Sequence, residues 1–324
     1  MLDHLHIQNY RLFKDLKIDK LGQVNLIAGK NNTGKTALLE VLRLLASDIE
    51  ITVLNDIINR RNDWFELSTN DFERGKTLFY NYKSLFYNQL ESNGNSIVLN
   101  EHCIKMAPFS AHFGYMLGYL IDNGKKEISY STYNDSLTPN DEALFVALQN
   151  DHNLDYKLWQ LINAHPDEDD VLEILSTIDG RILKLSVNDK KDFIILLGGQ
   201  MGPFSLKSLG DGANRLLSIA LALVNAKNSI LLIDEFEVGL HHSVQEQLWE
   251  IIFKYAKEWN IQVFVTTHSQ DTVKAFSYIS SKEEYNDMGQ YMRLQPSRKT
   301  GEIEAVIYPQ DSLENSLDLN LETH

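Results

Sequence analysis

The sequence predicts an α/β fold built on a mainly parallel sheet. Residues 230–233 form a continuous apolar run bounded by polar residues, which is the pattern of a strand buried on both faces of a parallel sheet, and residues 24–28 are interpreted as a short buried strand. A third buried strand, expected at 261–266, follows a helix expected at 243–258. Strands that alternate with helices in this way predict parallel strand–helix–strand units.

The N-terminal part is expected to begin with an antiparallel β part. Residues 2–8 and 15–19 alternate loosely between apolar and polar side chains, as edge strands do. The strand at 24–28 then leads through a Gly- and Asn-rich turn into an apolar helix that starts at Thr36. We therefore assign residues 1–49 to one main domain, which continues later in the chain.

Residues 50–180 carry a weaker signal and are interpreted as a mainly helical insertion that elaborates this domain. The elements expected within it are short strands at 96–99 and 127–133 and helices at 141–163 and 168–177. From 181 the order returns with a hairpin at 181–187 and 192–197 and a helix that ends at Val224. Residues 181–324 are therefore expected to complete the main domain.

The composition excludes several classes of protein. The 324 residues are 43% hydrophobic, which is enough for a large core, and their 45 acidic and 30 basic side chains give a net charge of −15. Such an acidic chain does not coat itself broadly on nucleic acid or an anionic membrane, so DNA binding is possible only through a local patch. The single cysteine, the lack of a signal segment and the lack of a membrane-length apolar run predict a cytoplasmic protein.

A glycine-rich turn follows the strand at 24–28. Residues 29–36 read Gly-Lys-Asn-Asn-Thr-Gly-Lys-Thr and fit the phosphate-binding pattern G-x-x-x-x-G-K-[ST] at every fixed position. Backbone N–H groups at the start of the following helix can donate to phosphate, and Lys35 is expected to reach the β- and γ-phosphates. The alternative is a chance glycine-rich turn. The predicted contacts of the ATP cofactor are Gly29, Asn31, Asn32, Thr33, Gly34, Lys35, Thr36 and Ala37.

Two carboxylates follow the apolar run at 230–233. Asp234 is expected to hold Mg²⁺ together with the Thr36 hydroxyl, and Glu235 to act as the general base that polarises the attacking water. We expect this strand to be the neighbour of the strand that carries the phosphate-binding turn. A solvated strand end is the alternative, since single acidic pairs are common there.

Two further segments are candidates for the site. His268 follows the strand at 261–266 and could stabilise the transferring phosphate, although a lone histidine is more often structural. Residues 208–215 place a serine and two glycines before a helix, which makes a second anion-binding helix start. One triphosphate does not need two such sites, so this loop is expected to cap the nucleotide of another subunit. A simple helix cap is the alternative.

Together these motifs resemble the ABC-type ATPases of the SMC, RecF and OLD class, closest to OLD-like ATPases that lack the Toprim nuclease domain. Asn31 stands at the asparagine of the class's G-x-N-x-x-G-K-[ST] form, and residues 6–14 resemble its first strand and turn. Ser208, Gly210 and Gly212 resemble the S-x-G-x-G signature. The resemblance covers residues 1–48 and 181–275. A Q-loop glutamine is not identifiable, and His242 stands where the class usually has proline.

The resemblance implies a P-loop ATPase head that dimerises head-to-tail around two ATP molecules. Each ATP would lie on Lys35 and Thr36 of one chain and under the signature of the other, and hydrolysis through Glu235 and His268 would release the dimer. The catalytic residues so implied are Glu235, His268 and Lys35, and the chain is expected to contain no nuclease site. The implied function is Mg²⁺-dependent ATP hydrolysis that switches a separate effector, a nuclease or toxin, in anti-phage defence. The alternatives are an ATP-gated scaffold with little hydrolysis and a RecF-like DNA-repair ATPase.

Overall fold

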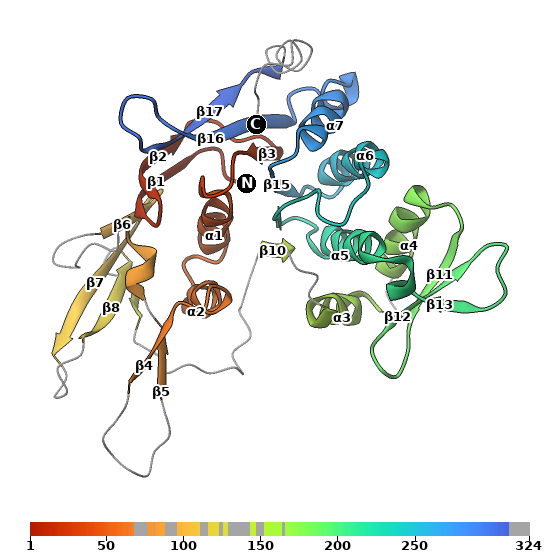
Figure 1. Ribbon diagram of the computed structural model, residues 1–324, viewed down its shortest axis with the longest axis horizontal. Coiled ribbons are helices and arrows are strands. Elements are labelled where there is room, and N and C mark those ends of the chain that lie inside the picture. The colour runs from red at the N-terminus through yellow and green to blue at the C-terminus, as the bar shows by residue number, and fades with distance from the viewer. Residues whose placement is uncertain are drawn as a thin grey trace.

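The central sheet has six strands in the order β10-β14-β15-β3-β16-β17. The computed structural model describes residues 1–67, 77–80, 82–87, 96–110, 116–122, 126–128, 143–146, 152–163 and 166–310. The strands of this sheet are β10 (Ala143–Val146), β14 (Ile230–Ile233), β15 (Gln262–Thr267), β3 (Val24–Ala28), β16 (Gly289–Pro296) and β17 (Ile303–Tyr308). All neighbours pair in parallel except β17, which is antiparallel to β16. The predicted α/β fold with a mainly parallel sheet is thus confirmed (Figure 1).

The order of the central strands differs from the sequence-based expectation in one respect. β15 lies between β3 and β14, so the strand that ends in the acidic pair is not the neighbour of the strand that leads into the phosphate-binding turn. β15 is buried along its whole length, and β3 also has no exposed residue. The acidic pair therefore reaches the turn across the end of β15, whose side chains become part of the site.

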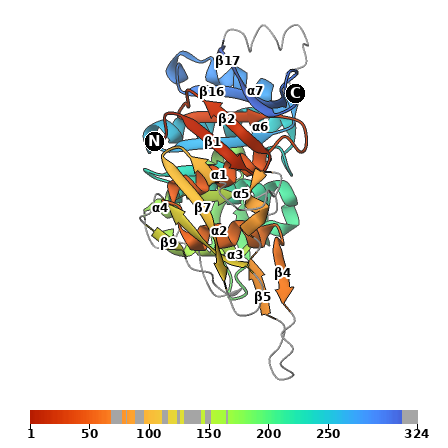
Figure 2. The ribbon, with the colours of Figure 1, turned by 90° about the vertical axis from the view of Figure 1, so that its left-hand side faces the viewer.

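A second sheet of six strands is antiparallel throughout and has the order β2-β1-β6-β7-β8-β9. Its strands are β1 (Leu5–Tyr10), β2 (Phe13–Ile18), β6 (Ser96–Leu99), β7 (His102–Ser110), β8 (Met116–Asp122) and β9 (Lys126–Ile128). This sheet stands at one side of the molecule (Figure 2). It confirms the predicted N-terminal antiparallel part. The segment 50–180 was expected to be mainly helical, but β6 pairs with the free edge of β1, and the strands β6 to β9 extend this sheet.

Helices cover both faces of the central sheet. They are α1 (Lys35–Ala46), α2 (Ile51–Arg60), α3 (His152–Ile162), α4 (Asp167–Ile178), α5 (Asp211–Asn225), α6 (His242–Glu258) and α7 (Gln270–Ser280). Ile27, Leu232 and Phe264 point to a core shared with α1, α2 and the antiparallel sheet. Their neighbours Leu26 and Leu231 point to the opposite core, which contains α5, α6 and α7. The alternation of strand side chains thus builds two cores on one sheet.

The segment between 141 and 178 also differs from its prediction. The single helix expected at 141–163 is a strand, β10, and a shorter helix, α3. β10 joins the edge of the central sheet beside β14, and α3 and α4 pack on α5. The structure thus brings the end of the presumed insertion into contact with the main domain, and the division at residue 180 stays a prediction.

Shorter elements complete the chain. The predicted hairpin is confirmed and gains a third strand, and a separate two-stranded ribbon lies after α2. These elements are β11 (Ile182–Val187), β12 (Phe193–Leu197), β13 (Pro203–Ser205), β4 (Trp64–Leu67), β5 (Thr77–Tyr80) and the 3-10 turns η1 (Tyr82–Leu85), η3 (Leu206–Leu209) and η4 (Glu283–Tyr285). Within the described ranges, the helices are all too short or too polar to cross a membrane.

Candidate active site

The glycine-rich turn between β3 and α1 has the tight curvature that its glycines predict. A Cβ at Gly29 would lie 2.5 Å from Thr33 Oγ1 and 2.8 Å from the Leu294 carbonyl oxygen. Gly34 adopts a φ of 94°, and a Cβ there would lie 2.7 Å from the Phe13 ring. Both positions therefore require glycine, one for close approach and one also for a left-handed backbone.

Lys35 is the first residue of α1 and is only 7% exposed. Its Nζ donates hydrogen bonds to the carbonyl oxygens of Gly29 (2.8 Å) and Lys30 (3.1 Å), so the ammonium group is held inside the curve of the turn. Burial lowers the pKa of Lys35, and the carboxylates of Glu235 and Asp234 oppose that shift. A buried cation enclosed by backbone in this way is suited to an anionic ligand.

The predicted magnesium ligands meet across the end of β15. Thr36 Oγ1 donates to Asp234 Oδ2 at 3.0 Å. The other carboxylate oxygen, Asp234 Oδ1, accepts a 2.6 Å hydrogen bond from Thr266 Oγ1, and Thr266 is fully buried. The Thr266 hydroxyl also accepts from the backbone N–H of Glu235 at 2.8 Å. Thr266, which the sequence analysis did not single out, thus fixes both acidic residues.

Glu235 has an unusual backbone conformation, with a φ of 48°. Such a conformation costs free energy in a non-glycine residue and persists only where its surroundings hold it. Arg215, which is 1% exposed, supplies part of this support from α5 by donating to the carbonyl oxygens of Asp234 (2.6 Å) and Glu235 (3.2 Å). Phe236, the next residue, is buried and stacks on Trp249 with ring centroids 4.5 Å apart.

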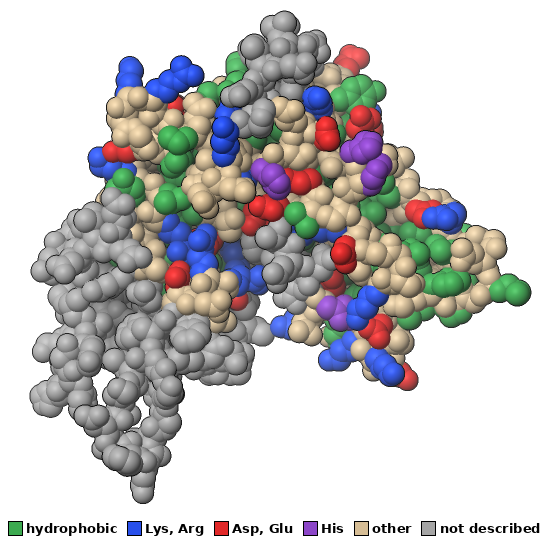
Figure 3. Space-filling model, in the orientation of Figure 1, with side chains coloured by type: hydrophobic (Ala, Val, Ile, Leu, Met, Phe, Trp, Pro, Cys, Tyr) green, Lys and Arg blue, Asp and Glu red, His purple; other side chains and the backbone are tan. Residues whose placement is uncertain are grey.

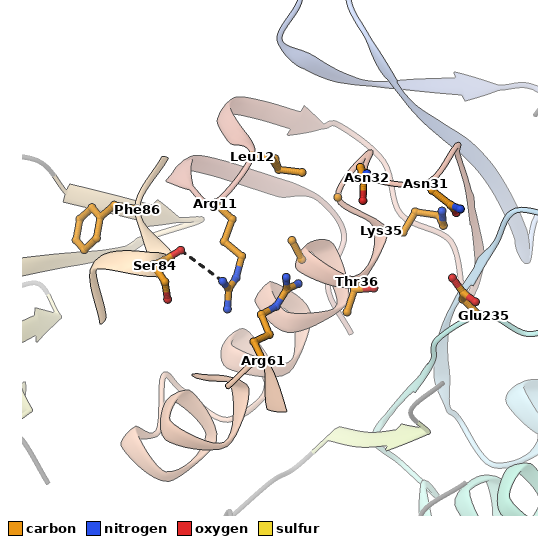
Figure 4. A pocket seen from close by; sticks show the side chains of 12 residues that line it. Arg11, Leu12, Asn31, Asn32, Lys35, Thr36, Arg61, Ser84, Phe86 and Glu235 are labelled. Carbon is orange, nitrogen blue, oxygen red and sulfur yellow. Dashed lines mark hydrogen bonds between the residues drawn. The ribbon is translucent and has the colours of Figure 1, made fainter. Parts of the chain in front are cut away.

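An open cleft of about 750 Å³ lies over the turn. Its lining residues are Arg11, Leu12, Asn31, Asn32, Gly34, Lys35, Thr36, Ala37, Arg61, Ser84, Phe86 and Glu235. Figure 4 shows Lys35 and Glu235 on one side of the cleft and the two arginines on the other. The structure therefore brings most of the predicted phosphate-binding residues together with the predicted base in one cavity.

The two arginines in the cleft are held by one carboxylate. Glu40, which is 7% exposed, accepts hydrogen bonds from Arg11 Nε (2.7 Å), Arg61 Nε (2.5 Å) and the Tyr10 hydroxyl (3.0 Å). Burial and the Glu40 carboxylate both raise the pKa of Tyr10, so its hydroxyl stays a donor. Arg11 and Arg61 were not predicted to lie in the cleft with Lys35, because they are far from the glycine-rich motif in sequence. In Figure 3, Lys and Arg side chains lie next to acidic ones near the middle of the molecule.

His268 lies just beyond the end of β15, and the described lining of the cleft does not include it. Its Nδ1 is 2.7 Å from Glu237 Oε1, and its backbone N–H donates to the same oxygen at 2.9 Å. The other oxygen, Glu237 Oε2, accepts from the Thr267 hydroxyl at 2.7 Å. The predicted histidine therefore lies at the same edge of the sheet as Asp234 and Glu235. The carboxylate that contacts its ring is that of Glu237.

The predicted signature residues lie outside the cleft of their own chain. Ser208 is exposed, and its hydroxyl donates to the Ser205 carbonyl oxygen at 2.6 Å. Gly210 has a φ of 92°, and a Cβ there would meet no atom within 4 Å. At Gly212, by contrast, a Cβ would lie 2.6 Å from the Gly239 carbonyl oxygen. Packing within the chain thus accounts for glycine at 212, whereas 210 faces open space.

The fold and this arrangement of turn, acidic strand end and histidine define an ABC-type ATPase of the SMC and RecF class. The chain belongs to the AAA ATPase domain family, whose model matches residues 1–179. A second model, described as "AAA domain, putative AbiEii toxin, Type IV TA system", matches residues 120–273.

Individual proteins agree with this assignment. The chain is 23% identical over 337 residues to an "ATP/GTP phosphatase" of Helicobacter pylori, a match that covers 88% of this chain and 90% of that protein. It is 28% identical over 105 residues to the "DNA double-strand break repair Rad50 ATPase" of Archaeoglobus fulgidus, covering 32% and 11% of the two chains. The fold is similar to that of a Pyrococcus furiosus Smc head domain crystallised with the C-terminal domain of ScpA, with a TM-score of 0.54, 10% identity and coverage of 99% and 98%.

Proposed function

We propose that this chain hydrolyses ATP in the cleft between α1 and the ends of β14 and β15, in a reaction that depends on Mg²⁺. The observation that carries the proposal is the convergence of three groups: the buried Lys35 ammonium, the Thr36–Asp234 pair and Glu235. Lys35 and the backbone of the turn would bind the β- and γ-phosphates. Glu235, which lines the same cleft, would take a proton from the attacking water.

The Thr36 and Asp234 oxygens fit a magnesium ion. Mg²⁺ prefers oxygen ligands and in phosphate-binding sites keeps waters and phosphate oxygens as further ligands, so one hydroxyl and one carboxylate suffice. These two oxygens are already 3.0 Å apart, and Thr266 orients the carboxylate from behind. When bound, the ion would supply charge neutralisation on the transferring phosphate.

The test compares purified wild type with two variants. Lys35→Ala is expected to abolish ATP binding in titration calorimetry, and Glu235→Gln to bind ATP but lose turnover. Glu258→Gln is the matched control, because Glu258 is an exposed residue at the end of α6. Hydrolysis by Glu235→Gln at the wild-type rate, or tight ATP binding by Lys35→Ala, would contradict the proposal.

We propose further that two chains sandwich ATP head-to-tail, with Ser208 and Gly210 of one chain over the cleft of the other. The exposure of Ser208 and the open space at Gly210 support this arrangement. So does the described lining of the cleft, which contains no signature residue of the same chain. Glu235→Gln is expected to form a dimer with Mg²⁺–ATP in light scattering and to stay a monomer without it.

Complementation tests the sandwich directly. Lys35→Ala and Ser208→Arg chains are each expected to be inactive, whereas a 1:1 mixture should regain about a quarter of the wild-type rate, because half of the dimers contain one intact site. Ser281→Arg is the control, since it places the same side chain at an exposed serine after α7. A mixture as inactive as its components would refute a shared site.

We also propose that the dimer switches a separate effector in anti-phage defence. The match of residues 120–273 to the toxin-type AAA domain model supports this biological setting. Coexpression with the product of a neighbouring gene should protect cells against phage, and Glu235→Gln should change that protection.

The scaffold alternative predicts no turnover by wild type alone. The DNA-repair alternative predicts salt-sensitive DNA binding by the isolated chain, against its net charge of −15.

A further inference from the structure

Glu237 is a carboxylate whose two oxygens bind two consecutive residues at the end of β15. Oε1 accepts from the backbone N–H of His268 (2.9 Å) and lies 2.7 Å from its Nδ1. Oε2 accepts from the hydroxyl of Thr267 (2.7 Å), which is itself fully buried. The Glu237 side chain is only 12% exposed, whereas that of His268 is 47% exposed. The histidine ring is thus anchored at Nδ1 and remains about half exposed to solvent.

The chemistry of this contact determines where the ring proton resides. A carboxylate only accepts hydrogen bonds, so Nδ1 of His268 must carry a proton at 2.7 Å from Glu237 Oε1. The opposite nitrogen, Nε2, is then the atom that remains for a phosphate oxygen or a water. Because its Nδ1–H is bonded to Glu237, His268 has one defined tautomer and one defined ring orientation.

The turn that carries Glu237 is also rigidly attached. Phe236 precedes Glu237, donates its backbone N–H to the Thr266 carbonyl oxygen at 3.0 Å and stacks on Trp249 in the core. Glu235, one residue earlier, lines the cleft. The Glu237 carboxylate, like those of Glu235 and Asp234, opposes the lowering of the Lys35 pKa that burial causes. One short turn therefore presents the base and the anchor of the histidine together.

We propose that Glu237 is a positioning residue for hydrolysis, which fixes the ring orientation and the Nδ1–H tautomer of His268 so that Nε2 faces the γ-phosphate. This inference rests on the proposed ATP hydrolysis. It adds a residue that acts through His268 and does not touch the nucleotide. Glu237 is expected to affect turnover and not ATP binding, because the groups proposed to bind phosphate are in the turn between β3 and α1 and at the start of α1.

The test uses Glu237→Gln, His268→Ala and the double variant in the full-length chain. Glu237→Gln keeps the size of the side chain, but its amide can both donate and accept, so it no longer imposes one tautomer. We expect kcat to fall about 10- to 100-fold, because misplacement of a catalytic group by a small distance is costly. The KM for ATP should stay within about twofold, since the loss is confined to the transition state. In the His268→Ala background, Glu237→Gln should have no further effect.

A spectroscopic measurement separates positioning from general weakening of the fold. The ¹⁵N shifts of the His268 ring, identified by comparison with His268→Ala, should report Nδ1–H in the wild type and a mixture of tautomers in Glu237→Gln. Should Glu237→Gln fail to fold, Thr267→Val removes the donor to the other carboxylate oxygen, together with the acceptor of the Ser269 N–H. It should lower kcat in the same direction by a smaller factor.

The possible outcomes distinguish this inference from the function on which it rests. If Glu235→Gln hydrolyses ATP like the wild type, the proposed function fails, and the role of Glu237 fails with it. If Glu235→Gln is inactive while Glu237→Gln keeps the wild-type kcat or the wild-type tautomer, only the positioning role is overturned. Equal losses from Glu237→Gln with and without His268 would likewise overturn it.

Discussion

Replacement of Thr266 by valine tests how the acidic strand end is held. The two side chains have nearly the same shape, so the change leaves no cavity and keeps a β-branched residue in β15. It removes the 2.6 Å hydrogen bond to Asp234 Oδ1 and the acceptor of the Glu235 N–H. A hydrogen bond to a charged group contributes about 1.5–3 kcal/mol, and an unsatisfied buried N–H costs about 1–3 kcal/mol. The expected loss in the free energy of unfolding is therefore on the order of 3 kcal/mol.

Thermal unfolding and steady-state hydrolysis measure the two consequences. The Tm should fall by about 6 °C, at about 2 °C per kcal/mol for a chain of this size. Mg²⁺-dependent turnover should fall as well, because Asp234 and Glu235 lose a shared anchor. Thr266→Ser is the control: it keeps the hydroxyl, loses one methyl group and should cost about 1 kcal/mol. If the valine variant is as stable as the serine variant, the hydroxyl does not hold the site and the reasoning is refuted.

Three further changes have defined outcomes. Because burial lowers the Lys35 pKa, the unfolded chain holds that proton more tightly, so Lys35→Met should raise the Tm of the nucleotide-free protein at neutral pH. The difference from wild type should shrink as the pH rises toward 10.5, and a constant difference would contradict it. Gly212→Ala places a methyl group against the Gly239 carbonyl oxygen and should lower the free energy of unfolding by about 1–3 kcal/mol, measured by urea denaturation. Glu40→Gln removes the charge that faces Arg11 and should cost about 3 kcal/mol in the same assay, whereas a loss below about 1 kcal/mol would argue against a structural role.

The elements that the sequence predicted best are those whose signals are local. β14 is an uninterrupted apolar run, β3 is apolar except for Asn25, and the glycine-rich turn has a fixed spacing. These signals can be recognised without knowledge of the rest of the chain. β10 shows the limit of this approach. Its four apolar residues fit a strand or part of a helix equally well, and pairing with β14, more than 80 residues away, decides in favour of the strand. β6, by contrast, was predicted as a strand at 96–99 and is confirmed, and only its pairing with the free edge of β1 required the structure.

The residues of the site likewise fall into those predicted from a local motif and those revealed only by the structure. Lys35 and Thr36 follow from their motif, and the structure adds the 3.0 Å contact between Thr36 and Asp234. Thr266 is a hydroxyl residue in a mainly apolar strand, and the sequence around Glu237 is typical of a solvent-exposed turn, so neither residue was predicted to belong to the site. Their roles arise only when β15 is placed between β3 and β14, an order that no local pattern specifies.

The position of β15 also has a consequence for the synthesis of the chain. β14 completes its pairing on β15, and β3 pairs with β15 and then with β16. β15, the earlier of these two partners, leaves the ribosome more than 200 residues after β3. At translation rates of about 5–20 residues per second, this interval is on the order of ten seconds or more. During it both edges of β3 lack their partner strands, and Thr266, which holds Asp234 and Glu235, has not yet been made. The central sheet around the glycine-rich turn therefore takes its final form only after β15 and β16 have been made.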